Sequence, residues 1–320
     1  MKNVFHWIVC FCLLLSLGAC KKEKNQPKSI QLENLVWTKI QEGLTLNIID
    51  VGSELYLAKQ NQVLKSADMG NTWTKLGWPA DINIIGGMVY SPQKNQLIIG
   101  AANNGWYYSV DKGVNFQASG PSAFNTGSAD IHSLSNGQLI ATMGGSLRGL
   151  YKANGNTPLN WRQSFGGVDF SSITKFSDDT LYACGTGAPA IVKSFDGGEN
   201  WIPVENKSHA VDYITAFRDS ILVVHRWGTI SAAKVNNFID LYAVRSSIAG
   251  NMVHYGDYAP KDTLLIVTAS ENGIYLSRDN ARNFKYHAIP GVKIYIRPKI
   301  IGDYLFVNTD AGLYRAQFKF

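Results

Sequence analysis

A tandem repeat with a spacing near 43 residues constrains this chain more than any other feature. Residues 66–73 (SADMGNTW) and 194–201 (SFDGGENW) share the pattern S-x-D-x-G-x-x-W. Residues 109–116 fit with phenylalanine last, and residues 277–284 form a worn copy in which alanine replaces the glycine. The copies at 66 and 109 start 43 residues apart. The copies at 194 and 277 start 83 residues apart, which corresponds to two repeats. A period of about 40–45 residues is typical of a four-stranded propeller blade.

The spacing also indicates where degraded copies lie. A longer, altered copy, which we call the swollen copy, lies between Tyr151 and Trp161. Its Lys152 takes the serine position, 43 residues after Ser109. Another copy is due near position 236, where the sequence keeps a strand-like run at 228–231 but has lost the motif. The repeats alternate short β-branched and aromatic runs with Gly, Asn and Asp, which favours strands throughout.

The chemistry of the motif is local to a turn. Serine and aspartate side chains can bond backbone groups that a tight hairpin leaves unpaired, and glycine supplies a positive φ. We therefore expect each motif to join the third and fourth strands of a blade, and we assign its residues a structural role. These residues are Ser66, Asp68, Gly70, Trp73, Ser109, Asp111, Gly113, Phe116, Ser194, Asp196, Gly198, Trp201, Ser277, Asp279 and Phe284.

Counting the third strands predicts seven blades. The seventh third strand, at 312–315, reaches the C-terminus without an aromatic-led fourth strand after it. The missing strand lies at the other end of the chain, because residues 37–40 (WTKI) closely copy residues 73–76 (WTKL). The sequence thus predicts an all-β, seven-bladed propeller of four-stranded blades, closed by its N-terminal strand. Six or eight blades remain alternatives, because the fifth repeat is weak.

These motifs and their spacing resemble the Asp-box (BNR) propeller superfamily over residues 30–320. That superfamily includes bacterial sialidases, sortilin-type receptors, some xyloglucan-cleaving enzymes and photosystem II assembly factors. The resemblance implies architecture and leaves activity open. Sialidases use an arginine triad and an Arg-Ile-Pro segment near the start of the propeller. Residues 37–66 contain no arginine, and 295–298 (YIRP) has the wrong order and place. Sialidase activity is therefore not expected.

The N-terminus resembles a bacterial lipoprotein signal. Lys2 precedes an apolar run at 4–17 that is too short to span a membrane, and the run ends in LGAC at 17–20. We predict a signal peptide at 1–19, acylation of Cys20 and a flexible tether over 20–30, followed by a single domain at 31–320. An ordinary signal peptide with an incidental cysteine is the alternative. Because Lys21 follows the cysteine, an outer-membrane location in the cell envelope is expected.

Charge and cysteine content exclude several classes of function. The formal net charge of the chain is +6. Four lysines and one glutamate lie in the tether, so the folded body is near neutral. This gives no argument for nucleic-acid binding. Cys184 remains alone in the apolar run 181–184, where a small core residue is expected. The histidines are scattered, so neither a metal site nor a cofactor is predicted.

A ligand or partner site is expected on the face opposite the motif turns, where loops of many blades meet. Aligning the repeats places Asp130, Asp169 and Asp212 at equivalent starts of innermost strands. These aspartates either cap strands or form an acidic ring for a cation or a hydroxyl-rich ligand. The His-Arg-Trp sequence at 225–227 either is exposed and binds a sugar ring or a partner's carboxylate, or belongs to a packed loop. The full candidate set is Asp130, Asp169, Asp212, Arg148, His225, Arg226, Trp227, Glu271, Tyr295, Arg297 and Asp310.

The functional prediction is a membrane-anchored, extracytoplasmic, non-enzymatic module that binds or assembles a protein partner or a glycan. Its motivation is a complete scaffold without a recognisable catalytic set. The alternative is a carbohydrate-active enzyme, a hydrolase or lyase, that uses carboxylates on the same face. That chemistry needs two carboxylates at a set separation, and the sequence does not single out such a pair.

Overall fold

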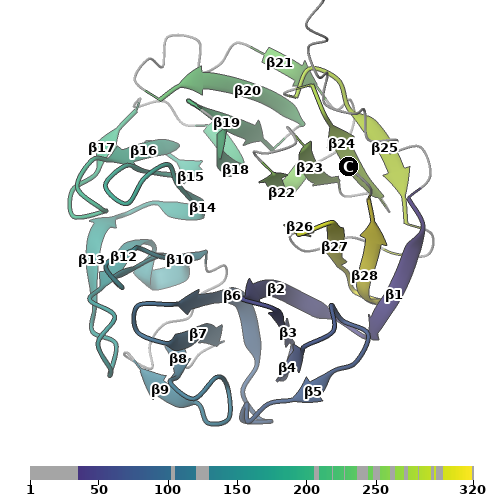
Figure 1. The fold of residues 1–320 in the computed structure, drawn as a ribbon. Coiled ribbons are helices and arrows are strands. Elements are labelled where there is room, and N and C mark those ends of the chain that lie inside the picture. Colours follow the sequence, from purple (N-terminus) through teal and green to yellow (C-terminus); the bar gives the residue numbers. More distant parts are fainter. Residues whose placement is uncertain are drawn as a thin grey trace, which may run out of the picture.

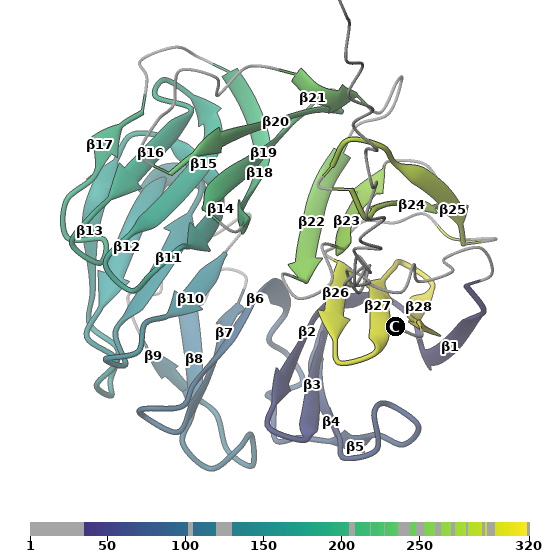
Figure 2. The same cartoon turned by 45° about the horizontal axis from the view of Figure 1, so that its top comes forward.

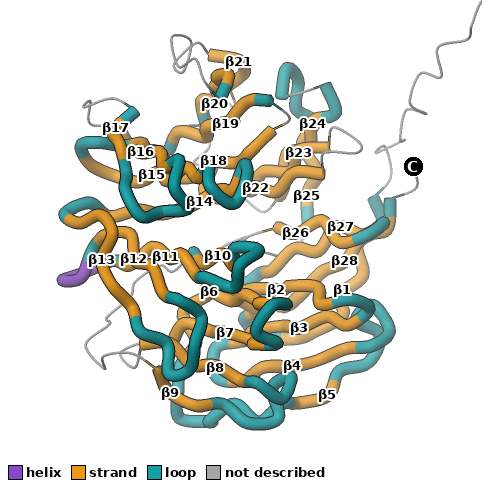
Figure 3. Tube along the Cα trace, turned by 60° about the vertical axis from the view of Figure 1, so that its left-hand side comes forward, coloured by secondary structure: helices purple, strands orange, loops and turns teal. Residues whose placement is uncertain are grey.

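The computed structural model describes residues 35–101, 105–119, 130–204, 209–217, 219–226, 228–235, 244–247, 253–259, 264–269, 273–279, 281–289, 292 and 298–318. In this part of the chain, antiparallel strands surround a central axis as blades (Figure 1). Apart from the short 3-10 helix η2 (Gly145–Leu147), shown in purple in Figure 3, the architecture consists of strands and loops. The prediction of an all-β propeller is therefore confirmed.

The described strands pair into five four-stranded sheets and one eight-stranded sheet. Taking the eight-stranded sheet as two units joined at an edge gives seven units, which we number as blades I to VII. Blade I contains β2 (Thr45–Val51), β3 (Glu54–Lys59), β4 (Gln62–Ser66) and β5 (Thr74–Lys75); blade II, β6 (Ile84–Ser91), β7 (Gln96–Ala101), β8 (Gly105–Ser109) and β9 (Gln117–Ser119); blade III, β10 (Ile131–Ser133), β11 (Leu139–Met143), β12 (Gly149–Ala153) and β13 (Trp161–Gly166); blade IV, β14 (Asp169–Lys175), β15 (Leu181–Gly187), β16 (Ile191–Ser194) and β17 (Ile202–Pro203). Blade V contains β18 (His209–Phe217), β19 (Ser220–His225), β20 (Thr229–Lys234) and β21 (Val244–Ser247); blade VI, β22 (Val253–Ala259), β23 (Leu264–Ala269), β24 (Gly273–Ser277) and β25 (Lys285–Ala288); blade VII, β26 (Pro298–Ile301), β27 (Tyr304–Asn308), β28 (Gly312–Gln317) and β1 (Trp37–Glu42).

Apolar side chains fill the space between neighbouring blades on both faces of each sheet. Strand β7 is buried along its whole length, which is why its sequence is almost continuously apolar. A separate core cluster lies between each pair of adjacent blades, including blades VII and I, where Phe306 and Leu313 pack against Ile48 and Leu57. Cys184 lies in the cluster between blades IV and V, where burial raises the pKa of its thiol. It is a core residue there and not an available nucleophile.

The Asp-box turns share one hydrogen-bond pattern. In blade I the Ser66 hydroxyl donates to Asp68 Oδ1 at 2.8 Å and accepts the backbone N–H of Gly70 at 2.8 Å. Asp68 Oδ1 also accepts the backbone N–H of Thr72 at 2.8 Å. The Thr72 backbone and hydroxyl donors, with Ser66, lower the pKa of Asp68 to about 2. The copies at Ser109, Ser194 and Ser277 repeat the arrangement.

The degraded copies replace this pattern in different ways. In the worn copy Ala281 occupies the glycine position and still adopts a φ of +61°. In the swollen copy Lys152 reaches across to blade IV, where its buried ammonium lies 2.7 Å from Glu199 Oε1. Glu199 is also paired with Arg162 of blade III. An ion pair between blades thus stands where the other copies have an internal serine–aspartate turn.

The ring is closed by the first strand of the fold, as predicted. Strand β1 pairs antiparallel with β28, with Trp37 opposite Ala316 and Glu42 opposite Gly312, and it lies along the outer edge of blade VII (Figure 2). Blade VII also bonds to blade I directly, because Thr45 N–H donates to the carbonyl oxygen of Thr309 at 3.1 Å. Residues at opposite ends of the sequence therefore hold the ring together.

We predict that Ser109→Ala lowers the free energy of unfolding by about 1–3 kcal/mol, because the buried N–H of Gly113 loses its acceptor. Urea unfolding followed by tryptophan fluorescence measures this change. Ser146→Ala, at an exposed position in η2, is the control and should change it by less than about 0.5 kcal/mol. Equal effects of the two substitutions would contradict the structural role of the box.

A second prediction concerns the closure. Gly312 has a φ of +145°, and a Cβ there would lie 2.0 Å from the carbonyl oxygen of Gln41 in β1. Gly187 has a similar φ, +142°, but the nearest atom to its Cβ position is Val168 Cγ1, at 3.4 Å. The backbone strain of alanine is therefore similar in the two variants, so Gly312→Ala should be less stable than Gly187→Ala by about 1–3 kcal/mol because of the clash with β1. Matching urea midpoints for the two variants would argue against β1 as the closing strand.

Candidate functional site

The central channel is built from all seven innermost strands, β2, β6, β10, β14, β18, β22 and β26, which surround the axis in Figure 1. It contains a cavity of about 290 Å³. Apolar walls come from Ile49, Met88, Val89 and Ile173, among others. The polar and titratable lining residues are Asn47, Asp130, His132, Thr174, Tyr213, Thr215, Asp257 and Lys299.

Several polar side chains of the channel bind the backbone of the next blade. Asp130 Oδ2 accepts the N–H of Ile173 at 2.9 Å, and Asp257 Oδ2 accepts the N–H of Ile300 at 2.7 Å, each 43 residues later in the sequence. Thr174 Oγ1 accepts the N–H of Ala216 at 2.8 Å in the same way. These bonds fix both the innermost strands and the side chains themselves. The polar lining is therefore preorganised.

Each of the two channel acids also has a basic group nearby. His132 Nε2 lies 3.6 Å from Asp130 Oδ1, and Lys299 Nζ lies 3.6 Å from Asp257 Oδ2. The acids are largely buried, whereas the side chains of His132 and Lys299 are 33% and 40% exposed. A ligand entering the channel therefore meets the Lys299 side chain more readily than the carboxylate behind it, whereas Nε2 of His132 is itself buried.

A second cavity, of about 390 Å³, continues the channel toward the face that carries the Asp boxes. It shares Ile49, Val89 and Lys299 with the first cavity. Its remaining lining comes from the ends of β2 and β6 and the turns after them: Asp50, Val51, Gly52, Tyr90 and Pro92. The described concave surface thus extends toward the motif turns, while the site was expected on the opposite face. Parts of the loops on that opposite face, 102–104, 120–129, 205–208 and 293–297, lie outside the described residues.

Asp212 and Arg226 form one unit at the corner between blades IV and V. Arg226 donates from Nε and a terminal nitrogen to Asp212 Oδ1 at 3.1 and 2.9 Å, and from that terminal nitrogen to Thr186 Oγ1 at 3.3 Å. Its backbone N–H donates to the carbonyl oxygen of Ala210 at 3.0 Å. At this corner β15 also pairs with β18, which joins the two blades into the eight-stranded sheet. The ion pair therefore links blades IV and V, and the Arg226 side chain is 39% exposed.

The three aspartates that the repeats align do not occupy equivalent places. Asp130 lies opposite Thr142 and is buried, whereas Asp169 pairs with Thr186 at the far end of β15 and is exposed. Asp212 is a buried residue at an irregularity in β18, between Val211 and Tyr213. The expected alignment fails because bulges in β14 and β18 shift the register. The structure brings Asp130 to the channel and leaves Asp169 at the rim.

The other sequence candidates are dispersed. His225 Nε2 lies 2.9 Å from Ser231 Oγ, beside Arg226 at the corner. Arg148 and Asp310 are exposed in the loops before β12 and β28. Trp227, Glu271, Tyr295 and Arg297 lie outside the described residues.

Sequence reasoning missed Asp257, His132, Thr174 and Lys299. The available signal was a polar side chain within a run predicted to be an innermost strand, such as Asp257 within 253–259. Because adjacent positions of a strand face opposite sides, a register uncertain by one residue hides which polar groups reach the axis.

In the described residues no group of three or more His, Cys, Asp or Glu side chains has the geometry of a metal site. Within the same residues no helix is long and apolar enough to cross a membrane.

No protein-family model and no curated protein sequence matches this chain. Solved structures do match in fold. YCF48 bound to a D1 peptide is 13% identical, with a TM-score of 0.66 over 88% of this chain and 94% of that one. A catalytically inactive virginiamycin B lyase from Staphylococcus aureus is 13% identical, with a TM-score of 0.71 over 89% and 99%. PorZ, a surface component of the type-IX secretion system of Porphyromonas gingivalis, is 14% identical, with a TM-score of 0.63 over 89% of this chain and 39% of PorZ.

These similar structures include a lyase as well as proteins without a stated activity, so their shared fold does not select a chemistry. They agree with the propeller fold described above. The chain is a β-propeller.

Proposed function

We propose that this chain is a non-enzymatic binding module, held by a lipid at Cys20 outside the cytoplasm, that receives a segment of a protein partner in its central channel. The observation that carries the proposal is the fixed polar lining of the channel. Asp130 and Asp257 are held by backbone N–H groups of the following blade. A site whose groups are already in place loses little side-chain entropy on binding.

The size of the channel favours a protein segment over a glycan chain. Its cavity of about 290 Å³ and the adjoining one of about 390 Å³ each lie near the lower end of the range for ligand pockets, about 300–1,000 Å³. Such a volume suits one or two side chains from an inserted loop or terminus. The lining offers carboxylates, imidazole, ammonium and hydroxyl groups, which match the hydrogen-bonding groups of a peptide.

Two solved relatives in fold support a partner of this kind. One solved structure shows YCF48 bound to a D1 peptide, and PorZ is a component of a secretion system. The LGAC sequence at 17–20 supports the anchor, and Lys21 after the cysteine supports an outer-membrane location. The alternative, a carbohydrate-active enzyme, is favoured less, because the oxygens of the channel acids serve as acceptors for the fold itself.

We predict that Val89→Trp abolishes partner binding by filling the channel, since Val89 lines both cavities. The measurement is cross-linking in cells through a photoreactive residue at position 215, which also lines the channel. The yield of the cross-linked partner should fall by about tenfold or more. Ile202→Trp, at an exposed site on the outer strand β17, is the matched control and should leave it unchanged.

A thermal unfolding curve for each variant separates loss of binding from loss of fold. If Val89→Trp is unstable, charge reversal by Lys299→Glu at the half-exposed channel lysine provides the second variant. An undiminished cross-link in both channel variants would refute the channel as the binding site. Turnover of a glycan by the purified chain, lost on Asp130→Asn or Asp257→Asn, would establish the enzymatic alternative instead.

A further inference from the structure

Exposed apolar side chains are concentrated on one face of the propeller. We call this the Asp-box face: it carries the box turns and the turns between the first and second strands of each blade. Among the described residues, seven large hydrophobic side chains are exposed. Five of them lie at the Asp-box face: Val36, Val110, Val114, Phe176 and Phe195. Single exposed hydrophobic residues are ordinary on soluble proteins, so their shared location is the informative point.

The turns that carry these side chains are tightly held. Val110 and Val114 flank Asp111, whose carboxylate accepts the backbone N–H of Asn115 at 2.9 Å. Phe195 precedes Asp196, which holds Asn200 in the same way. The carboxylates of the box acids accept hydrogen bonds from their own hairpins. The apolar side chains beside them are 48–62% exposed. The hairpins present apolar tips with little freedom to fold them away.

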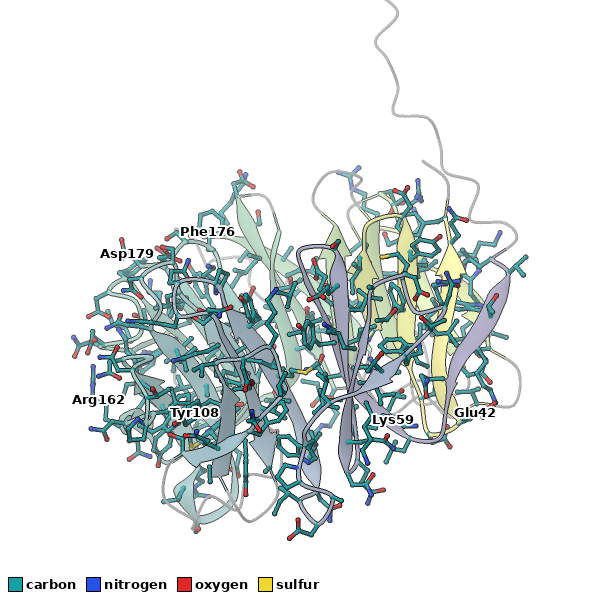
Figure 4. All side chains as sticks on the ribbon, turned by 60° about the horizontal axis from the view of Figure 1, so that its bottom comes forward. Glu42, Lys59, Tyr108, Arg162, Phe176 and Asp179 are labelled. Atoms are coloured by element: carbon teal, nitrogen blue, oxygen red, sulfur yellow. The ribbon has the colours of Figure 1, made fainter. Side chains whose placement is uncertain are left out.

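Basic groups accompany these tips. Lys112 is exposed at the turn between Val110 and Val114, and Lys193 Nζ lies 5.0 Å above the Phe195 ring. Phe176 lies near the exposed acid Asp179, and both lie far from Glu42 and Lys59, which are at the opposite face (Figure 4). Aromatic and aliphatic tips with nearby lysines suit the interfacial region of a bilayer. The acid beside Phe176 limits that contact to headgroup depth.

The chain enters the fold at the same face. Strand β1 starts with Trp37 opposite Ala316, and the end of β28 bonds to the turn between β26 and β27 through Phe318 and Asp303. Arg315 of β28 donates to Asn71 in the box turn of blade I at 3.1 Å. Val36, directly before β1, is 76% exposed. Fourteen residues, 21–34, separate Cys20 from Leu35, and a fully extended chain of this length spans at most about 50 Å.

We propose that the Asp-box face is held against the bilayer that carries the anchor, with Val36, Val110, Val114, Phe176 and Phe195 at the lipid interface. The proposal rests on the proposed acylation of Cys20. A short connection from the lipid to one face raises the local concentration of that face at the membrane, so weak apolar contacts suffice to orient the body. The opposite face, which carries Arg226 and Arg148 in the loops between second and third strands, then points away from the membrane, and the partner reaches the channel from that face.

The test uses the chain from Cys20 onward, coupled at Cys20 to a maleimide lipid in vesicles of phosphatidylethanolamine and phosphatidylglycerol. The buried Cys184 does not compete for the reagent. An environment-sensitive fluorophore, introduced as a non-natural residue, replaces Val114 on the Asp-box face or Ser146 on the opposite face. Lipids with a quencher near the headgroup report the distance of each label from the bilayer.

Quenching at position 114 should exceed quenching at position 146 by about threefold or more. The double variant Val110→Asp, Phe195→Asp should reduce quenching at 114, whereas Ser146→Asp on the opposite face should not. Equal quenching at both positions, or stronger quenching at 146, would overturn the orientation.

A separate arm distinguishes this orientation from the anchor itself. In cells, Cys20→Ser should release the full-length protein from the membrane fraction. If it does not, the proposed acylation fails, but the vesicle experiment still decides the orientation, because its lipid is attached chemically. Loss of the cross-linked partner by channel variants is independent of both readouts.

Discussion

The pairing of β1 with β28 is the interaction on which the rest of this structure depends. Without this pairing blade VII would lack its fourth strand and expose the edge of β28, and the facing apolar sides of blades VII and I would be uncovered. The cluster between blades VII and I, with Ile48, Leu57 and Phe306, exists only in the closed ring. The channel depends on the same closure, because Lys299 of blade VII meets Ile49 of blade I there.

The repeat made the closure predictable, because its recurring residues form hydrogen bonds to backbone groups of the hairpin. The serine and aspartate of each box satisfy fixed hairpin groups, so they recur at a fixed spacing, and a missing fourth strand at one end has to be supplied by the other. The copy of residues 73–76 at 37–40 was enough to identify it. Even the worn copy retained the geometry, with Ala281 in the left-handed region that glycine would favour.

The channel was less predictable because its polar residues follow no common sequence motif. Asp130, Thr174 and Asp257 each accept an N–H from the next blade, yet they differ in residue type. Bulges in β14 and β18 further shift the register, so Asp169 and Asp212 did not fall where the spacing of the repeats placed them. A conserved period fixes the blades to within a residue or two, and one residue decides which side of a strand faces the axis.

The two faces of the propeller carry different constraints. On the Asp-box face, hydrogen bonds within each turn determine the polar residues, so the remaining positions, such as Val114 and Phe195, are free to vary and are apolar here. On the other face, the Arg226–Asp212 pair shows that even charged loop residues can serve a joint between blades. Charge at a loop is therefore a weak guide to a binding site in this fold. A polar group fixed by the scaffold and still lining the channel, as at Asp257, is a stronger one.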